Sequence, residues 1–456
     1  MISIFGIILI LSMSFYIIKN LKNENLGKNL YFISIVSLLV LDIGYIAKIG
    51  SFTLEYNYFF SIINFVFTIY YFLKNRKNLE KKDIIIIFSF LLLILFSLLF
   101  PLVFNLKYNS VAFNDSWDSY FGTNKELKEI GFSKHSLGMY ARVIIFILST
   151  YVFSKSLEKD DIKKYSNCIY NISWFIIGIS LIEFIITNFI DNFAFRHFAF
   201  FLFGRSAATY ELPRITFGGI FAPMAFMREP SSYVRALFII GINNVFVYIN
   251  SKGLLNKERI KIIANIVIVL FLIALSKSLS GYIYIIGINV IIWDFIKNKK
   301  IKLSLAIVSS IFIIIICILL HERIQKVFGA FSKFNMNPNS LPAQSELIRF
   351  YSINNNIQLF LHNLLLGCGF GTVYCYSSVI TLLTNIGIIG VGVYIYIINY
   401  ITNISIKEKF FSWLTFIVVI ITGFFIGHMS YITYLENFAY EIIILKSIDH
   451  KIKQND

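Results

Sequence analysis

The ten arginines of this 456-residue chain are placed differently from its 31 lysines. Eight of them lie in or beside three long polar segments, residues 105–136, 190–232 and 321–376, where arginine is as frequent as lysine. These eight are Arg142, Arg196, Arg205, Arg214, Arg228, Arg235, Arg323 and Arg349. A guanidinium group presents a planar fork of donors that grips phosphate or carboxylate oxygens at two places. The pattern predicts an anion-binding site, and the alternative for any single arginine is an ion pair or contact with lipid headgroups.

A carboxylate and a helix-start signature stand beside one of these arginines. Arg228 is followed directly by Glu229, Pro230 and Ser231. Proline and serine favour the first turn of a helix, and the positive end of that helix then faces an anion. The same residues are equally consistent with a plain helix cap.

Lys277 lies in a short turn between two apolar stretches, among Ser276, Ser278 and Ser280. An ammonium group there could contact phosphate as a point charge. The alternative is a solvated lysine in a surface turn.

The four cysteines and six histidines show no spacing typical of metal ligands. We therefore expect neither a metal nor another cofactor. Cys368 and Cys375 share one stretch and could pair on an oxidising face, but small apolar residues are the favoured interpretation.

The composition excludes a soluble protein. Hydrophobic residues make up 57% of the chain and charged residues 14%, and there are 48 Phe and 27 Tyr. Only lipid can solvate so much apolar surface, so the chain is expected to be an all-α polytopic membrane protein. Apolar stretches of spanning length begin near Ile2, Leu30, Tyr58, Ile84, Leu137, Cys168, Tyr233, Ile262, Leu279, Leu303, Ser377 and Phe410. This predicts about twelve transmembrane helices.

Every second loop between these stretches is rich in lysine. Together these loops hold 22 basic and eight acidic residues, which is +14 of the net charge of +16. The positive-inside rule places them in the cytoplasm and the amino terminus outside. The net charge is thus an orientation signal, and no nucleic-acid partner is expected.

No internal repeat or low-complexity linker is visible, so residues 1–456 are expected to form one membrane domain. The three long polar segments named above would lie on its outer face and carry the function. The side on which the tail from Tyr431 ends stays open, which leaves the count at twelve or thirteen helices.

Two stretches resemble the O-antigen polymerase and ligase superfamily, in particular capsular and O-antigen polymerases of the Wzy type. The first runs from Arg214-Ile-Thr-Phe-Gly-Gly to Arg228-Glu229-Pro230-Ser231-Ser232, and the second from Arg349 through Gly367-Cys-Gly369-Phe-Gly371 to Gly387-Ile-Ile-Gly390. The resemblance covers roughly residues 142–390. The interval between Arg214 and Arg228 is longer than usual, so either arginine could fill the family role. The pair Gly387 and Gly390 is read as close helix packing.

The resemblance implies a GT-C-like fold with its active site at the outer face of the cytoplasmic membrane. It also implies that a glycan on undecaprenyl diphosphate is transferred onto the sugar hydroxyl of a new lipid-linked repeat unit. Membrane lipids, this lipid-linked oligosaccharide, a chain-length regulator and a flippase are the expected partners.

The resemblance and the chemistry together suggest roles for individual residues. Arg214 and Arg349 are expected to stabilise charge on the departing diphosphate without a metal. Glu229 is the first candidate for the general base and Glu183 the second, although Glu183 could instead pair with an arginine. The expected substrate-binding residues are Arg142, Arg228, Arg235 and Lys277.

Two other functions stay open as alternatives. Ligases of the superfamily carry a histidine where this chain has Tyr376-Ser377-Ser378, so polymerase is favoured over ligase. A lipid-linked oligosaccharide flippase would gather arginines inside its spans, whereas the long arginine-bearing segments here lie between the spans. That difference favours surface chemistry over transport.

Overall fold

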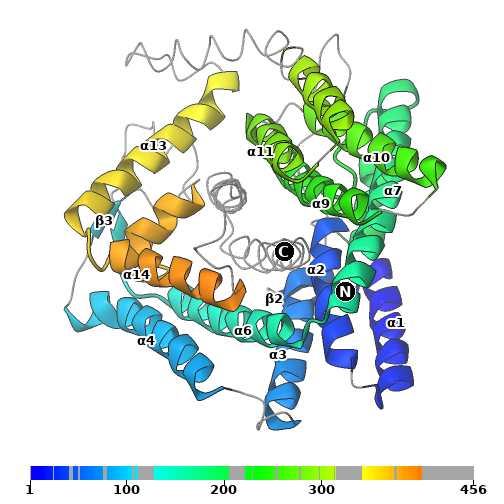
Figure 1. Ribbon diagram of the computed structural model, residues 1–456. Helices are drawn as coiled ribbons and strands as arrows, with labels where there is room; N and C mark the ends of the chain where they lie inside the picture. The colour runs from blue at the N-terminus through cyan, green and yellow to red at the C-terminus, as the bar shows by residue number, and fades with distance from the viewer. Residues whose placement is uncertain are drawn as a thin grey trace.

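The structure of the protein is a computed structural model. It describes residues 2–23, 25–40, 45–49, 52–74, 80–104, 108–110, 128–204, 221–227, 230–251, 255–276, 279–296, 298–312, 314, 341–373 and 377–402. Within these ranges the fold is built almost entirely from helices (Figure 1). Their bounds are α1 Ile4–Asn20, α2 Leu26–Val40, α3 Tyr56–Lys74, α4 Lys81–Val103, α6 Lys134–Ser156, α7 Lys159–Phe189, α8 Ala194–Phe203, α9 Pro230–Asn250, α10 Asn256–Leu275, α11 Leu279–Phe295, α13 Leu341–His362 and α14 Ser378–Thr402. A further helical segment covers residues 299–312.

Among the described helices, five are long and apolar enough to cross a membrane. These candidate spans are Lys81–Val103, Ser136–Ser156, Asp160–Phe189, Ser232–Asn250 and Val379–Ile397. Large apolar side chains on several helices also face outward, among them Leu11, Phe15 and Ile18 of α1. Lipid is the solvent that suits such a surface. The described chain is built as a helical membrane protein, while the count of twelve spans and the single-domain boundaries stay predictions.

Two short antiparallel strand pairs accompany the helices of this otherwise helical chain. Strands β1 (Tyr45–Ile49) and β2 (Phe52–Glu55) pair antiparallel, as do β3 (Tyr108–Ser110) and β4 (Lys128–Ile130). The backbone N–H of Ser3 donates to the carbonyl of Ile46 at 3.1 Å, which ties the start of α1 to the first hairpin. These strands are three to five residues long, so hydropathy over a membrane-length window does not detect them.

The helices form two groups joined by α2 and α3 (Figure 1). In one group α14 packs against α4 and α13, and α4 packs against α6. In the other, α9 packs against α7, α10 and α11, and nearly all of its apolar stretch is buried. A single hydrophobic cluster runs through both groups, from Tyr31 of α2 to Ile397 of α14. The central position of α9 matters because its first turn belongs to the motif that starts at Arg228.

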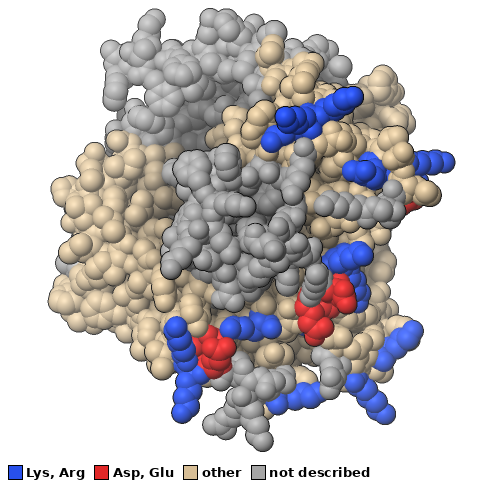
Figure 2. Space-filling model, viewed as in Figure 1, with Lys and Arg blue, Asp and Glu red and all other residues tan. Residues whose placement is uncertain are grey.

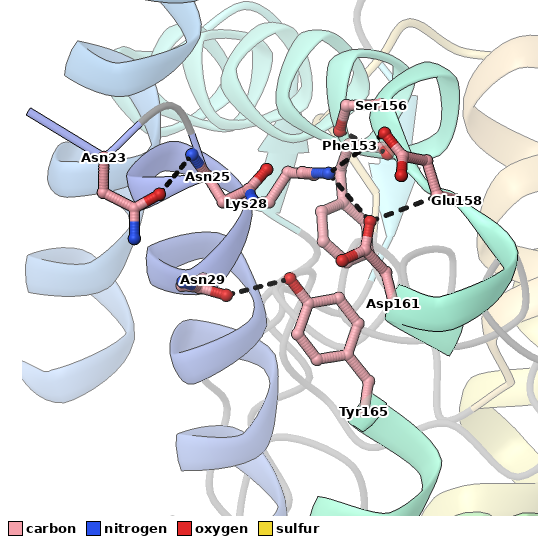
Figure 3. Close-up of polar contacts among 9 residues, drawn as sticks. All are labelled: Asn23, Asn25, Lys28, Asn29, Phe153, Ser156, Glu158, Asp161 and Tyr165. Atoms are coloured by element: carbon pink, nitrogen blue, oxygen red, sulfur yellow. Dashed lines mark hydrogen bonds and ion pairs between the residues drawn. The ribbon is translucent and has the colours of Figure 1, made fainter. Parts of the chain in front are cut away.

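Basic side chains are spread over the face of the molecule that Figure 2 shows. Exposed lysines lie at the helix ends of the loops predicted to be cytoplasmic, and we call these helix ends the lysine-rich face: Lys19, Lys22, Lys74, Lys81, Lys82, Lys155, Lys163, Lys164, Lys257, Lys261, Lys299 and Lys300. Helix ends on this face are fastened to one another by polar contacts. The Nζ atom of Lys28 lies 2.7 Å from Oδ2 of Asp161, and the hydroxyl of Tyr165 donates to Asn29 at 3.2 Å (Figure 3). These two contacts join the first turn of α2 to the first turns of α7.

Asp83 fastens three more helices at the same face. Its carboxylate is 1% exposed and accepts hydrogen bonds from the hydroxyls of Tyr151 on α6 and Tyr400 on α14, the latter at 2.5 Å. The Nζ atom of Lys155 lies 3.0 Å from the same carboxylate. A buried carboxylate needs such partners, so this cluster holds α4, α6 and α14 in one register.

Candidate functional site

The structure describes two of the seven predicted site side chains. Arg142 lies on α6 and Arg235 on α9. Arg349 lies on α13, but its side chain is outside the described part. Four further predictions lie wholly outside the described residues: Arg214, Arg228, Glu229 and Lys277.

Arg235 is a buried cation near the start of α9. Arg235 is 9% exposed, and it lies five residues after Pro230, the first residue of the helix. It lies close enough to Tyr284 of α11 for the two groups to interact electrostatically. Tyr284 is fully buried and stacks on Phe238 with ring centroids 4.5 Å apart, and its hydroxyl has no hydrogen-bond partner among the described residues. A charge buried at this depth in a membrane helix is expected to meet an anion or a polar partner.

Arg142 has different surroundings. It is half-buried on α6, one of its terminal nitrogens lies 3.9 Å from Sδ of Met139, and it interacts electrostatically with Glu55 at the end of β2. These two contacts connect Arg142 to its own helix and to the first hairpin. They do not join it to Arg235.

A short strap, residues 221–227, precedes the motif at Arg228 and is held by Glu183 of α7. The Glu183 carboxylate accepts the backbone N–H groups of Met224 at 2.6 Å and Ala225 at 2.5 Å. Asn188, one turn further along α7, exchanges two hydrogen bonds with the backbone of Phe221, at 2.6 and 3.1 Å. The strap is thus fastened to α7 at two places.

Arg196 of α8 completes this anchor. One terminal nitrogen of Arg196 lies 2.7 Å from Oε1 of Glu183, and the other donates to the carbonyl of Met227 at 3.0 Å. Both side chains of the pair are buried, at 5% and 1% exposure. Of the two interpretations of Glu183, the structure shows the ion pair. Because both carboxylate oxygens are engaged in this arrangement, Glu183 is not placed to accept a substrate proton.

The strap also contains a backbone conformation that L-residues rarely adopt, since Ala225 has φ of 49°. Valine at a positive φ is strongly disfavoured, whereas glycine adopts it without penalty. We expect Ala225→Val to lower the free energy of unfolding by about 1–3 kcal/mol. Ala225→Gly is expected to leave stability unchanged or raise it by up to about 1 kcal/mol. Melting temperatures of the two variants in detergent would test this, and equal effects would contradict the left-handed turn.

The glycine motif forms a loop that pairs with a break in α14. Gly387 lies within α14 at φ 65° and ψ −174°, so the helix is interrupted there. The carbonyls freed on one side of the break accept N–H groups from Cys368 at 2.6 Å and Gly369 at 3.1 Å. On the other side, the N–H of Ile388 donates to Leu364 at 2.9 Å. This backbone pairing satisfies polar groups that could not remain open inside a membrane.

The side chain of Asn385 and two serines fix the loop further. Asn385 exchanges hydrogen bonds with the backbone of Val373 at 3.0 and 2.8 Å. Ser136 of α6 donates to the carbonyl of Gly371 at 2.9 Å, and Ser97 of α4 donates to that of Asn385 at 3.0 Å. The loop is therefore a packed junction of α4, α6 and α14. The N–H groups of Cys368 and Gly369 are already used and do not cradle a ligand.

The glycines permit this junction by their lack of a side chain. A Cβ on Gly387 would lie 2.2 Å from the carbonyl oxygen of Leu365, and a Cβ on Gly369 would lie 2.5 Å from Pro101 of α4. The three atoms nearest to a Cβ on Gly390 all belong to the side chain of Ile386, at 2.5–2.9 Å. Gly387 thus allows close packing, as predicted. The segment that packs against it is the backbone of residues 364–366 and not another helix.

Cys368 is buried in this junction as a free thiol. Burial raises the pKa of the Cys368 thiol to about 12, against a smaller opposing effect of its contact with Asn363. It is accordingly an unreactive small apolar residue, as the sequence favoured. Its proposed partner, Cys375, lies outside the described residues.

Over the described ranges, no three His, Cys, Asp or Glu side chains come together in a way that could hold a metal ion. The expectation of metal-free chemistry stays a prediction. Comparison with known proteins adds no family: no family model, no curated protein and no solved structure matches this chain.

Several residues that shape the site carry no sequence motif that marks their role. Arg196 is one of the eight arginines in and beside the polar segments, and the structure gives it the ion pair that was the alternative to anion binding. No motif marks Asn188, Asn385 or Tyr284. The available signal was polarity within apolar surroundings. Glu183 and Asn188 both interrupt the apolar end of α7, so a partner segment for them could be expected.

Proposed function

We propose that the protein polymerises lipid-linked oligosaccharide repeat units at the outer face of the cytoplasmic membrane. The proposal rests on the motif resemblance and on the helical membrane construction. In the proposed orientation the lysine-rich face lies in the cytoplasm. The strap, Arg235 and the first turn of α9 then lie toward the outside.

The observation that carries the proposal is the burial of Arg235 at the start of α9. This helix follows directly on Arg228 and Glu229, so the motif arginine, its carboxylate and a buried guanidinium fall within eight consecutive residues. The positive end of α9 adds to the same field. Such an arrangement suits a diphosphate, which carries several acceptor oxygens that arginines bind in pairs.

The proposed reaction is a glycosyl transfer. The bond between the anomeric carbon and the diphosphate oxygen breaks, and a bond to the hydroxyl oxygen of the acceptor sugar forms. Arg214, Arg349 and Arg235 would stabilise the negative charge that grows on the departing undecaprenyl diphosphate. Glu229 would accept the proton of the acceptor hydroxyl. Arg142, Arg228 and Lys277 would bind the substrate, and no metal enters the reaction.

Arg235→Met tests this proposal directly. A charge-assisted hydrogen bond to phosphate contributes about 1.5–3 kcal/mol, so kcat/KM for chain elongation should fall about 10–150-fold. Elongation by purified protein on undecaprenyl-diphosphate-linked repeat units would measure this.

A matched control is Arg259→Met at the opposite end of the helix pair. Arg259 of α10 donates to the hydroxyl of Tyr248 at 3.1 Å on the lysine-rich face. Its removal should leave elongation within about twofold of the wild type. Equal activity of the Arg235 variant and the wild type would contradict the proposed role of α9.

A further inference from the structure

We propose that Glu183 and Arg196 are positioning residues for the motif at Arg228 and Glu229. They would act by holding the strap, residues 221–227, in one conformation ahead of α9. This inference rests on the proposed function, because it assigns the pair a part in the same reaction. It gives Glu183 a role different from that of a general base.

The strap and α9 are fastened to the same helix on both sides of the motif. Before the motif, Glu183 of α7 holds Met224 and Ala225, and Arg196 holds the carbonyl of Met227. After it, the hydroxyl of Tyr233 on α9 shares a 2.7 Å hydrogen bond with Ser180, one turn before Glu183 on α7. All the residues that make these contacts are buried, including Met227 of the strap. Only Arg228 and Glu229 separate Met227 from the first residue of α9.

Stability alone is a poor explanation for this arrangement. A buried ion pair is often no more stabilising than apolar residues of the same size, because both charges must be removed from water. Its best-supported use is to fix one register among several. The strap shows such a use, since Glu183 binds two consecutive N–H groups around Ala225, whose positive φ is unfavourable without them.

The pair also cannot serve as an acid–base group in this arrangement. Glu183 is 1% exposed and Arg196 is 5% exposed, and each of the two carboxylate oxygens already has a partner. A substrate hydroxyl would have to displace the strap to reach Glu183. The contacts therefore assign the pair to positioning and leave Glu229 as the candidate base.

The test is the double variant Glu183→Gln with Arg196→Met. Glutamine keeps an acceptor for Met224 and Ala225, and removing both charges avoids a single unpaired one. The hydrogen bond from Arg196 to the Met227 carbonyl is lost. We expect kcat for elongation to fall about tenfold to a hundredfold, with KM for the lipid-linked repeat unit within about twofold of the wild type. Hydrogen exchange of the amides in residues 221–227 should rise as well.

The matched control is the double variant Lys28→Met with Asp161→Asn, which removes the ion pair of the lysine-rich face (Figure 3). Like the first pair it joins two elements, and it leaves the strap untouched. Its kcat should equal that of the wild type. If low activity came only from a general loss of stability, kcat would fall in both double variants alike.

Arg196→Lys provides a second variant should the double variant fail to fold. Lysine can keep the charge pair with Glu183, but its single ammonium group lacks the fork that reaches both Glu183 and Met227. A reduced kcat in a protein of wild-type melting temperature would support positioning. Wild-type kcat and unchanged hydrogen exchange in these variants would overturn it. Failure of the wild type itself to elongate glycans would instead contradict the proposed function.

Discussion

Gly387→Ala is expected to abolish most of the folded protein. The φ and ψ angles of Gly387 lie in a region that is essentially restricted to glycine. An added methyl group would also lie 2.2 Å from the Leu365 oxygen and 2.4 Å from its carbonyl carbon, and backbone atoms cannot move aside cheaply. Strain and overpacking together should lower the free energy of unfolding by about 3–5 kcal/mol. Yield on size exclusion in detergent and melting temperature would measure the loss.

Gly392→Ala on the same helix is the matched control. Gly392 is helical, and a Cβ built on it meets no atom within 4 Å. Alanine in a helix interior is more favourable than glycine by about 0.5–1 kcal/mol, so this variant should be as stable as the wild type or more so. If the Gly387→Ala variant had the same yield and melting temperature as the Gly392→Ala variant, α14 would be continuous and would not pair with the loop.

Asp83→Ala is expected to have the second largest effect. The substitution leaves the buried Tyr151 hydroxyl and the Tyr400 hydroxyl without their acceptor and removes the nearer of two carboxylates beside Lys155. A buried hydroxyl left unsatisfied costs about 1–3 kcal/mol, and the half-buried Tyr400 hydroxyl should cost less than that of Tyr151, so the total should be about 2–5 kcal/mol. The effect follows from the position of Asp83, because it is the point at which α4, α6 and α14 meet.

Glu80→Gln is the control for this prediction. Glu80 lies 3.8 Å from the same Lys155, but its side chain is 67% exposed. Exposed ion pairs contribute about 0–1 kcal/mol, so the melting temperature should hardly change. Combining Asp83→Ala with Tyr151→Phe should cost less than the sum of the two single variants, since both remove one shared bond. Additive losses would argue against the cluster.

The positions of the helices could largely be predicted from hydropathy. Apolar stretches predicted to begin near Ile84, Leu137 and Tyr233 correspond to α4, α6 and α9, and the stretch near Ser377 corresponds to α14. Apolar length is a local property, so it can be read from one segment without its neighbours. Most of the exposed lysines among the described residues likewise lie in the loops predicted to be cytoplasmic.

The pairing of segments could not be predicted in this way. The loop at Gly367 and the break at Gly387 fit each other only in three dimensions, and so do Glu183, Arg196 and Ala225. In the sequence, Gly387 is merely a small residue in an apolar stretch, so helix packing was the natural interpretation. Glu183 had two interpretations because its partner is 13 residues away, beyond the end of its helix.

The candidate site was predictable in part. The enrichment of arginine in and beside the segments predicted to face outside pointed to Arg235, and the structure shows that this residue is buried near the start of α9. The roles of Arg214, Arg349 and Glu229 still rest on the motif resemblance. What the structure adds is the strap, which connects the motif to α7 and α8 through contacts that no local pattern encodes.

Elongation by the purified wild-type protein is the most direct test of the proposed function. The protein in detergent would be incubated with undecaprenyl-diphosphate-linked repeat units, without added metal, and the glycans separated by size. The proposal predicts a ladder of products that grows by one repeat unit at a time and the release of undecaprenyl diphosphate. Glycans that remain one repeat unit long, with folded protein present, would contradict it.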